Sequence, residues 1–136
     1  MSRPGDHDTC PCGNGQAFAR CCKPLHDAGV AGLGTTAEAT MRSRYVAYVT
    51  QNEPYLLATW HESTRPTSID FSDDVEWHGL TVVSSTGGTG LDSAGTVEFR
   101  ARFRRGDAHL ELHERSEFIR ESGRWYYVSG VDPDLG

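Results

Sequence analysis

Four cysteines near the start of the chain are the residues best suited to do chemistry. Cys10 and Cys12 form one pair, Cys21 and Cys22 form a second, and a short loop that contains glycine joins the pairs. Thiolates bind zinc at about 2.3 Å in a tetrahedral shell, and a short loop brings two pairs to one ion at little cost in entropy. The spacing therefore predicts a zinc site in which one ion is held by all four thiolates.

Disulfides and free thiols are the alternatives for these cysteines. A bridge between Cys10 and Cys12, or between Cys21 and Cys22, would strain the backbone, because neighbouring Cβ atoms are badly placed for an S–S bond. A crossed pairing between the two clusters and four free thiols both stay open. If zinc binds, the closed shell leaves no position for water, so the metal is expected to be structural rather than catalytic.

A second set of polar residues lies in the C-terminal half of the chain. Apolar and charged side chains alternate over residues 97–104, and Gly106-Asp107 predicts a two-residue hairpin loop. In this register Glu114 lies opposite Phe99, and both Glu114 and Ser116 fall on the buried face of their strand. A buried carboxylate costs several kcal/mol unless it is paired or protonated. Glu114 therefore needs a partner.

The candidate partners of Glu114 are Arg44, on the first helix, and His61 or Trp60, just after the second helix. Three roles are open for the group: a structural tie between sheet and helix, a pocket for a small ligand, or a catalytic site. In a catalytic site Glu114 would act as acid or base, Arg44 would orient a negative group and His61 would assist. The sequence has no Gly-rich phosphate loop, nucleophile elbow or His-Glu-x-x-His motif. Whether the protein is an enzyme stays open at this point.

Two helices and a set of strands must position these residues. The first helix is expected to start at Thr35, because Thr35 and Glu38 fit a capping box, and the second follows Asn52 with Pro54 in its first turn. From residue 75 the apolar period changes to two, with a bulge expected at Gly79. The strands are predicted over residues 75–82, 97–104, 109–121 and 125–131. The pattern indicates an α+β fold with a curved antiparallel sheet packed on helices.

Composition and charge limit the class of protein. A chain of 136 residues suits one modest domain plus a small metal-organised segment. No apolar run approaches the ~20 residues that span a bilayer, and the first residues lack the apolar core of a secretory signal. Clustered thiols in such a chain indicate a reducing, cytoplasmic compartment. The net charge of −6 argues against bulk electrostatic binding to nucleic acid or anionic lipid.

The segment from Cys10 to Cys22 resembles the SEC-C motif, the zinc knuckle at the C-terminus of the SecA translocation ATPase. Further segments resemble the YchJ-like family of uncharacterised bacterial proteins, whose members join this knuckle to a domain similar to nuclear transport factor 2. The resemblance implies a zinc knuckle over residues 1–26, a Gly-rich linker over 27–34 and a cone-shaped nuclear transport factor 2-like domain over 35–136. The segments that carry it are residues 41–45, 55–61, 79–82, 114–118 and 123–127.

The resemblance leaves the activity open and suggests two functions. In SecA the motif binds partner proteins and the ribosome through a basic surface, so a protein partner at the knuckle is the first expectation. Two cations are missing here, because residues 13–17 are Gly-Asn-Gly-Gln-Ala where the family usually has Gly-Ser-Gly-Lys-Lys; Arg3, Arg20 and Lys23 remain. Ribosome or nucleic-acid binding is therefore disfavoured. The alternative is a small ligand or substrate in a cone cavity around Glu114, in a monomer or homodimer.

Overall fold

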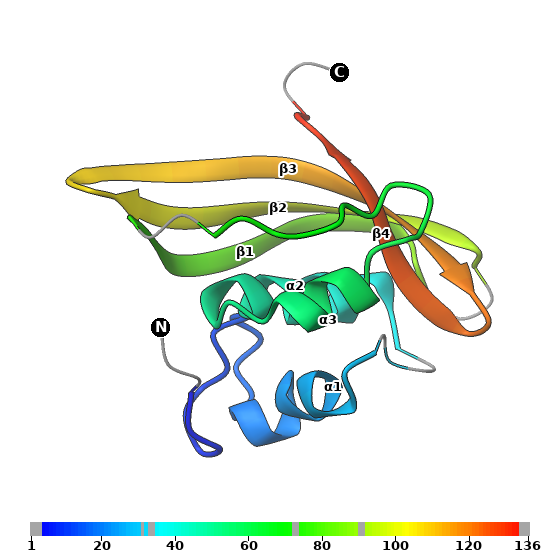
Figure 1. Cartoon of the computed structure of the whole chain (residues 1–136), viewed down its shortest axis with the longest axis horizontal. Helices are drawn as coiled ribbons and strands as arrows, with labels where there is room; N and C mark the ends of the chain where they lie inside the picture. Colours follow the sequence, from blue (N-terminus) through cyan, green and yellow to red (C-terminus); the bar gives the residue numbers. More distant parts are fainter. Residues whose placement is uncertain (1–3, 31, 33–34, 72–73, 90–91, 134–136) are drawn as a thin grey trace.

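The computed structural model describes residues 4–30, 32, 35–71, 74–89 and 92–133. The four strands form an antiparallel sheet in the order β1-β2-β3-β4. The sheet curves over α2 and α3, and the cysteine-bearing N-terminal segment with α1 lies on the other side of α2 (Figure 1). This is the α+β arrangement that the sequence predicts. The elements are a 3₁₀ helix η1 (Phe18–Arg20), helices α1 (Lys23–Ala28), α2 (Ala37–Val49) and α3 (Glu53–Ala58), and strands β1 (Val75–Gly87), β2 (Ala94–Arg105), β3 (Ala108–Glu121) and β4 (Arg124–Val131).

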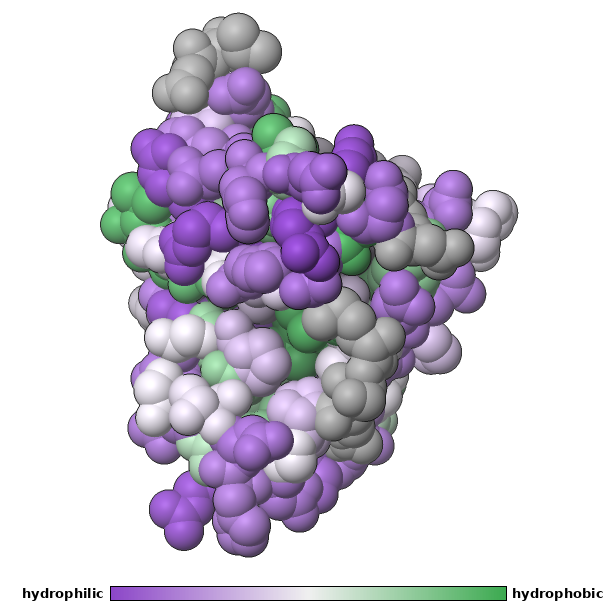
Figure 2. Space-filling model, turned by 90° about the vertical axis from the view of Figure 1, so that its left-hand side faces the viewer, coloured by the Kyte–Doolittle hydropathy of each residue, from purple (hydrophilic) through white to green (hydrophobic). Residues whose placement is uncertain are grey.

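The surface is dominated by polar side chains. None of the described helices has the length and hydropathy needed to cross a bilayer. On the outer face of the sheet Arg100 pairs with Glu111 at 2.8 Å, and Arg104 pairs with Glu76 at 3.0 Å. The end of the molecule toward which the β2–β3 turn projects is mainly hydrophilic, with hydrophobic atoms visible in patches (Figure 2). The apolar side chains are therefore concentrated between the layers.

The β2–β3 hairpin has the predicted register. Phe103 pairs with Leu110, and Phe99 pairs with Glu114. The turn is made by two residues, because Arg105 pairs with Ala108, and Gly106 supplies a positive φ of 58°. The register is fixed because a slip of one residue would turn every apolar side chain of the hairpin toward solvent.

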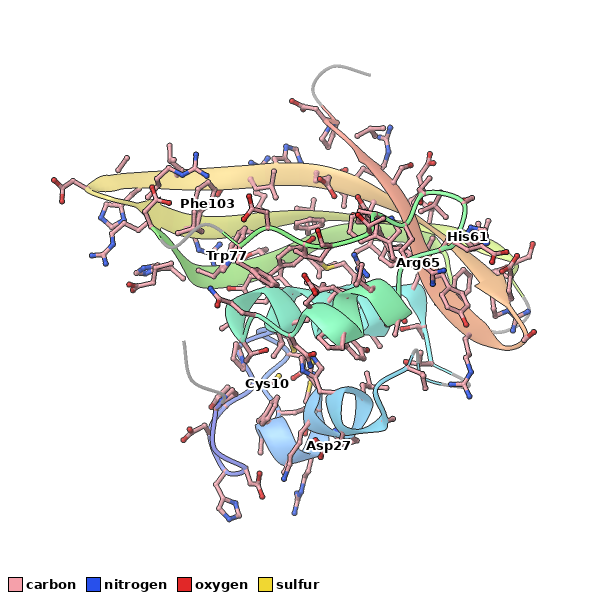
Figure 3. All side chains as sticks on the ribbon, in the orientation of Figure 1. Cys10, Asp27, His61, Arg65, Trp77 and Phe103 are labelled. Carbon is pink, nitrogen blue, oxygen red and sulfur yellow. The ribbon has the colours of Figure 1, made fainter. Side chains whose placement is uncertain are left out.

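The bulge predicted at Gly79 is confirmed and determines where Trp77 points. The pairing of β1 with β2 shifts between Trp77 and Gly79. In a regular strand residues 77 and 80 would point to opposite faces, but the extra residue places both Trp77 and Leu80 on the helix side. The Trp77 ring lies 5.2 Å from that of Phe103 and 6.0 Å from that of Tyr45 on α2 (Figure 3). The bulge thus brings a large aromatic side chain between the sheet and the helix.

The expected start of α2 at Thr35 is wrong by one residue. Thr36 is the N-cap, and its Oγ1 accepts the N–H of Ala39 at 3.0 Å. The reason lies outside the helix: the carbonyl of Gly88, in the β1–β2 loop, accepts the N–H of Ala37 at 3.0 Å. The cap of α3 is the predicted one, because Asn52 Oδ1 accepts the N–H of Tyr55 at 3.2 Å.

Replacing the two adjacent threonines separately tests this cap. Thr36→Ala removes the acceptor for the N–H of Ala39 and is expected to lower the free energy of unfolding by about 1 kcal/mol. Thr35→Ala is the matched control and should change it by no more than a few tenths of a kcal/mol. Urea unfolding of both variants decides the point. An equal loss in both, or a larger loss for Thr35→Ala, would contradict the assignment.

Candidate functional site

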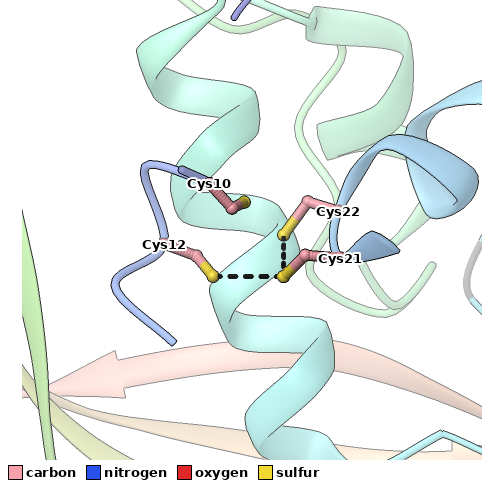
Figure 4. A group of neighbouring side chains, drawn as sticks. All are labelled: Cys10, Cys12, Cys21 and Cys22. Carbon is pink, nitrogen blue, oxygen red and sulfur yellow. Dashed lines mark hydrogen bonds between the residues drawn. The ribbon is translucent and has the colours of Figure 1, made fainter. Parts of the chain in front are cut away.

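The four cysteine side chains converge between the N-terminal loop and the start of α1. Their Sγ atoms all lie within 4.8 Å of one another. The separation is 3.4 Å between Cys12 and Cys21 and 3.7 Å between Cys21 and Cys22 (Figure 4). A tetrahedral ion with metal–sulfur bonds of about 2.3 Å requires sulfur–sulfur separations of about 3.8 Å. The thiols therefore form a cluster that could hold one metal ion.

The pKa values of the clustered thiols also favour the binding of a cation. All four cysteines are free rather than disulfide-bonded. Thiol hydrogen bonds from Cys10 and Cys22 lower the pKa of Cys12 to about 2. Burial raises the pKa of Cys21 to about 12, and hydrogen bonds with Cys10 and Cys12 raise the pKa of Cys22 far above its ordinary value. The Cys12 thiolate is thus stabilised by its neighbours, whereas Cys21 and Cys22 need a nearby positive ion to become thiolates.

The loop that carries Cys10 and Cys12 is held in place by hydrogen bonds and by the conformation of Gly13. The N–H of Cys10 donates to the carbonyl of Gln16 at 2.8 Å, and Asn14 Nδ2 donates to Cys21 Sγ at 3.0 Å. Gly13 has a φ of +83°, and a Cβ at this position would lie 3.0 Å from the carbonyl oxygen of Leu80 in β1. Glycine is required there, because a side chain would be strained and would push the loop off the sheet edge.

The knuckle is bound to α2 and shares the core of the domain. Arg42 Nη1 donates to the carbonyl of Cys12 at 2.6 Å. His26 Nε2 hydrogen-bonds with the carbonyl of Ser43 at 2.8 Å, and its ring stacks on Tyr55 at 4.5 Å. Three of the cysteines are at most 2% exposed and belong to the same hydrophobic cluster as side chains of α2 and the sheet: Cys10, Cys12 and Cys22. A metal ion here would hold together the N-terminal segment, whose buried cysteines pack against the main core.

A cavity of about 260 Å³ lies between α2 and the sheet. Its polar lining comes from Arg44 and the tyrosines of α2, from Glu114 and Ser116 of β3, and from Tyr127 of β4. Leu112, which is 38% exposed, also lines the cavity. The remaining walls are apolar or aromatic: Met41, Trp77, Phe99, Ala101 and Phe118.

Arg44 is a buried cation in the wall of this cavity. Its side chain is 5% exposed, and Nη1 donates to the carbonyl of Leu56 at 2.9 Å and to Thr59 Oγ1 at 2.7 Å. The guanidinium carbon lies 4.5 Å from the ring centre of Tyr127 and 5.0 Å from that of Trp60. Burial lowers the pKa of Arg44 to about 10, so the side chain is still charged at neutral pH.

Glu114 faces the same cavity from β3. Ser116 Oγ donates to Glu114 Oε2 at 2.9 Å. The carboxylate lies so close over Gly130 that a Cβ added there would collide with it. Among the residues that the structure describes, neither Glu114 nor Arg44 takes part in an ion pair. The two opposite charges therefore line one cavity without touching.

Gly130→Ala is expected to displace the Glu114 carboxylate without removing its charge. The added methyl group collides only with the far end of a flexible side chain, so the free energy of unfolding should fall by less than about 1 kcal/mol. NMR signals of the cavity lining should shift. Ser129→Ala is the matched control on β4, because Ser129 Oγ donates to Glu117 outside the cavity. A loss of several kcal/mol in Gly130→Ala would show that Glu114 is a structural tie.

His61 does not line the cavity. Its Nε2 lies 3.0 Å from Glu121 Oε1, and its Nδ1 lies 2.7 Å from Ser63 Oγ. The segment around it pairs with β4 through the isolated bridge from Trp60 to Tyr127. Because successive side chains of an extended segment point to opposite sides, Trp60 contacts Arg44 and His61 points away. Figure 3 shows His61 beside β4 and well separated from Trp77.

The structure thus brings together two of the three candidate residues, Arg44 and Glu114. It adds Thr59, Tyr127 and Gly130, which the sequence did not single out. A signal existed for Gly130, because small residues on a strand often mark the close approach of another group. The pairing of β3 with β4 shifts between Glu117 and Phe118. Counting residues from the β3–β4 turn therefore does not show that Gly130 pairs with Ser116.

The chain is similar over most of its length to a known family. The family model described as "YchJ, middle NTF2-like domain" matches residues 36–130. A UPF0225 protein from Chromobacterium violaceum is 49% identical over 126 residues, which cover 90% of this chain and 91% of the relative. A UPF0225 protein from Streptomyces avermitilis is 45% identical over 122 residues, which cover 90% of this chain and 83% of the relative.

Two solved structures resemble the whole chain. The solution structure of a SEC-C motif containing protein from Rhodopseudomonas palustris has a TM-score of 0.80 at 35% identity, and the match covers 92% of this chain and 98% of that one. The crystal structure of a SEC-C motif containing protein from Psychrobacter arcticus has a TM-score of 0.74 at 28% identity, with 91% and 82% covered. The chain therefore belongs to the YchJ-like family of UPF0225 proteins, which combine a SEC-C motif with a nuclear transport factor 2-like domain.

Proposed function

We propose that this protein binds a small organic ligand in the cavity between α2 and the sheet, and that the cysteine cluster is a structural zinc site. One observation carries the ligand proposal: Arg44, which is 5% exposed, and Glu114 line the same cavity without forming an ion pair. A buried cation without an anionic partner costs several kcal/mol. A cavity lined by aromatic side chains and a few converging polar groups is the usual form of a ligand site.

Zinc is the metal that best suits the cluster. Four thiolates in a tetrahedral arrangement favour zinc or an iron–sulfur site, and the closed shell of a single ion is typical of structural zinc. A reducing cytoplasmic compartment would keep the thiols available. The burial of Cys10, Cys12 and Cys22 supports a role in stability rather than in reaction.

Docking of a partner protein on the knuckle has weaker support. Of the basic residues that remain there, Lys23 is engaged with Asp6 at 2.7 Å. Arg20 is exposed, and Arg3 lies outside the described residues. The face that the knuckle turns to α2 is occupied by Arg42 and Ser43. Arg20 is the one exposed lysine or arginine among the described residues of the knuckle, and on an acidic chain this is a poor basis for binding acidic partners or nucleic acid.

Native mass spectrometry of gently purified protein tests the ligand proposal. The wild type is expected to carry one zinc ion and an additional organic mass. Arg44→Met should carry the zinc ion and lack the organic mass, because the metal cluster lies on the other side of α2. Identical masses for the two proteins would count against the cavity as the binding site.

A further inference from the structure

The cavity carries one positive and one negative group, and both have unused hydrogen-bonding capacity. The hydrogen bonds of Arg44 to described residues all come from Nη1. A guanidinium has five N–H donors, so those of Nε and Nη2 remain for a ligand. The Glu114 carboxylate accepts one hydrogen bond from Ser116, whereas a carboxylate has about four acceptor positions. The cavity therefore offers a donor group and an acceptor group at separate points.

Two tyrosines lie within range of both charges. Tyr48 and Tyr127 line the cavity together with Arg44 and Glu114. Burial and the charge of Glu114 raise the pKa of Tyr127 to about 12, and the charge of Arg44 acts in the opposite direction. Burial also raises the pKa of Tyr48, while the charge of Arg44 lowers it and that of Glu114 raises it. Both hydroxyls thus stay protonated at neutral pH, and both tyrosines line the cavity that holds the two charged groups.

The charges also restrict what the cavity can hold. A ligand with only a carboxylate would approach Arg44 and leave Glu114 facing a second negative charge. A ligand with only an amine would pair with Glu114 and leave Arg44 without an anion. A zwitterion satisfies both groups. The volume of about 260 Å³ lies just below the range of about 300–1,000 Å³ for drug-sized ligand sites, which suits a molecule the size of a free amino acid.

We propose that the ligand is a small amino acid-like zwitterion with an apolar or aromatic body. Its carboxylate binds the free donors of Arg44, and its ammonium group binds Glu114 beside Ser116. The body packs against the aromatic side chains of Trp77 and Phe118, which line the same cavity. This inference rests on the proposed ligand-binding function of the cavity and specifies the chemical class of the ligand.

Three probes that share one body separate the contributions of the two charges. They are L-phenylalanine, 3-phenylpropanoate, which lacks the amine, and 2-phenylethylamine, which lacks the carboxylate. In NMR titrations of the full-length, zinc-loaded protein, L-phenylalanine is expected to bind at least tenfold tighter than either of the others. Arg44→Met should weaken it to the level of 2-phenylethylamine, and Glu114→Gln should weaken it to the level of 3-phenylpropanoate.

The outcomes distinguish this inference from the proposed function. If 3-phenylpropanoate shifts the cavity signals and binds as tightly as L-phenylalanine, the cavity binds a ligand but the zwitterion proposal is overturned. Absence of binding by all three probes, or shifts confined to residues outside the cavity, also overturns the zwitterion proposal. The proposed ligand-binding function is then still tested by native mass spectrometry, which detects any organic mass that the wild type retains. If Glu114→Gln does not fold, Gly130→Ala takes its place, because it moves the carboxylate and keeps the charge.

Discussion

Replacing Cys12 with serine is expected to abolish metal binding and to lower Tm by more than about 10 °C. Cys12 is 0% exposed and lies in the same hydrophobic cluster as side chains of α2 and the sheet. The metal-binding free energy of a structural zinc site, about 10–16 kcal/mol in zinc-finger peptides, contributes directly to folding. A loss of only about 3 kcal/mol would lower Tm by about 12 °C at roughly 4 °C per kcal/mol. Metal analysis and calorimetry measure both effects.

Asn14→Ala is the matched control for this experiment. It leaves four thiolates in place and removes the hydrogen bond from Asn14 Nδ2 to Cys21 Sγ. The variant should keep one metal ion per chain and lose about tenfold in affinity, as is typical when a group that orients a ligand is removed. A Cys12→Ser protein that retains full metal content and the wild-type Tm would refute a structural role for the cluster.

Replacing Arg44 with methionine is expected to weaken ligand binding by at least about tenfold and to change stability by less than about 2 kcal/mol. The variant loses the hydrogen bonds to Leu56 and Thr59, each worth about 1 kcal/mol or somewhat more. It also removes a buried charge, which offsets part of this loss. Thr59 Oγ1 keeps its own hydrogen bond to Tyr55 at 2.8 Å. Ligand titration and urea unfolding of the same sample separate binding from stability.

Arg42→Met on the same helix is the control for Arg44→Met. Arg42 binds the carbonyl of Cys12 and Glu38, so its loss should loosen the knuckle and leave the cavity intact. Arg44→Met is thus expected to lose ligand affinity and keep most of its stability. Arg42→Met is expected to lose stability and keep its ligand affinity. A large loss of stability in Arg44→Met with unchanged ligand binding would mean that Arg44 is a structural residue.

The parts of the fold that depend on local sequence were predictable. The register of the β2–β3 hairpin follows from the alternation of apolar and charged residues and from the two-residue turn at Gly106. The convergence of the cysteines follows from their spacing, because a short loop limits where the two pairs can lie. The same register predicted Glu114 on the buried face, and Glu114 does line the cavity there, but it is half-buried rather than buried.

The parts that depend on contacts between distant segments were not predictable. Thr35 and Thr36 are equally good caps, and a carbonyl of the β1–β2 loop selects Thr36. The direction of His61 depends on the bridge from Trp60 to Tyr127, which joins residues far apart in the sequence. The separation of Arg44 from Glu114 depends on Leu56 and Thr59, which bind one end of the guanidinium. Sequence spacing contains none of these distances.

A crystal structure of the zinc-loaded protein at high resolution tests the central claim most directly. The account predicts one ion bonded to all four thiolates at about 2.3 Å. It also predicts that Arg44 and Glu114 stay apart, with the cavity open between them or filled by a small molecule. A direct ion pair between the two side chains that closes the cavity would contradict the account and make the pair a structural tie.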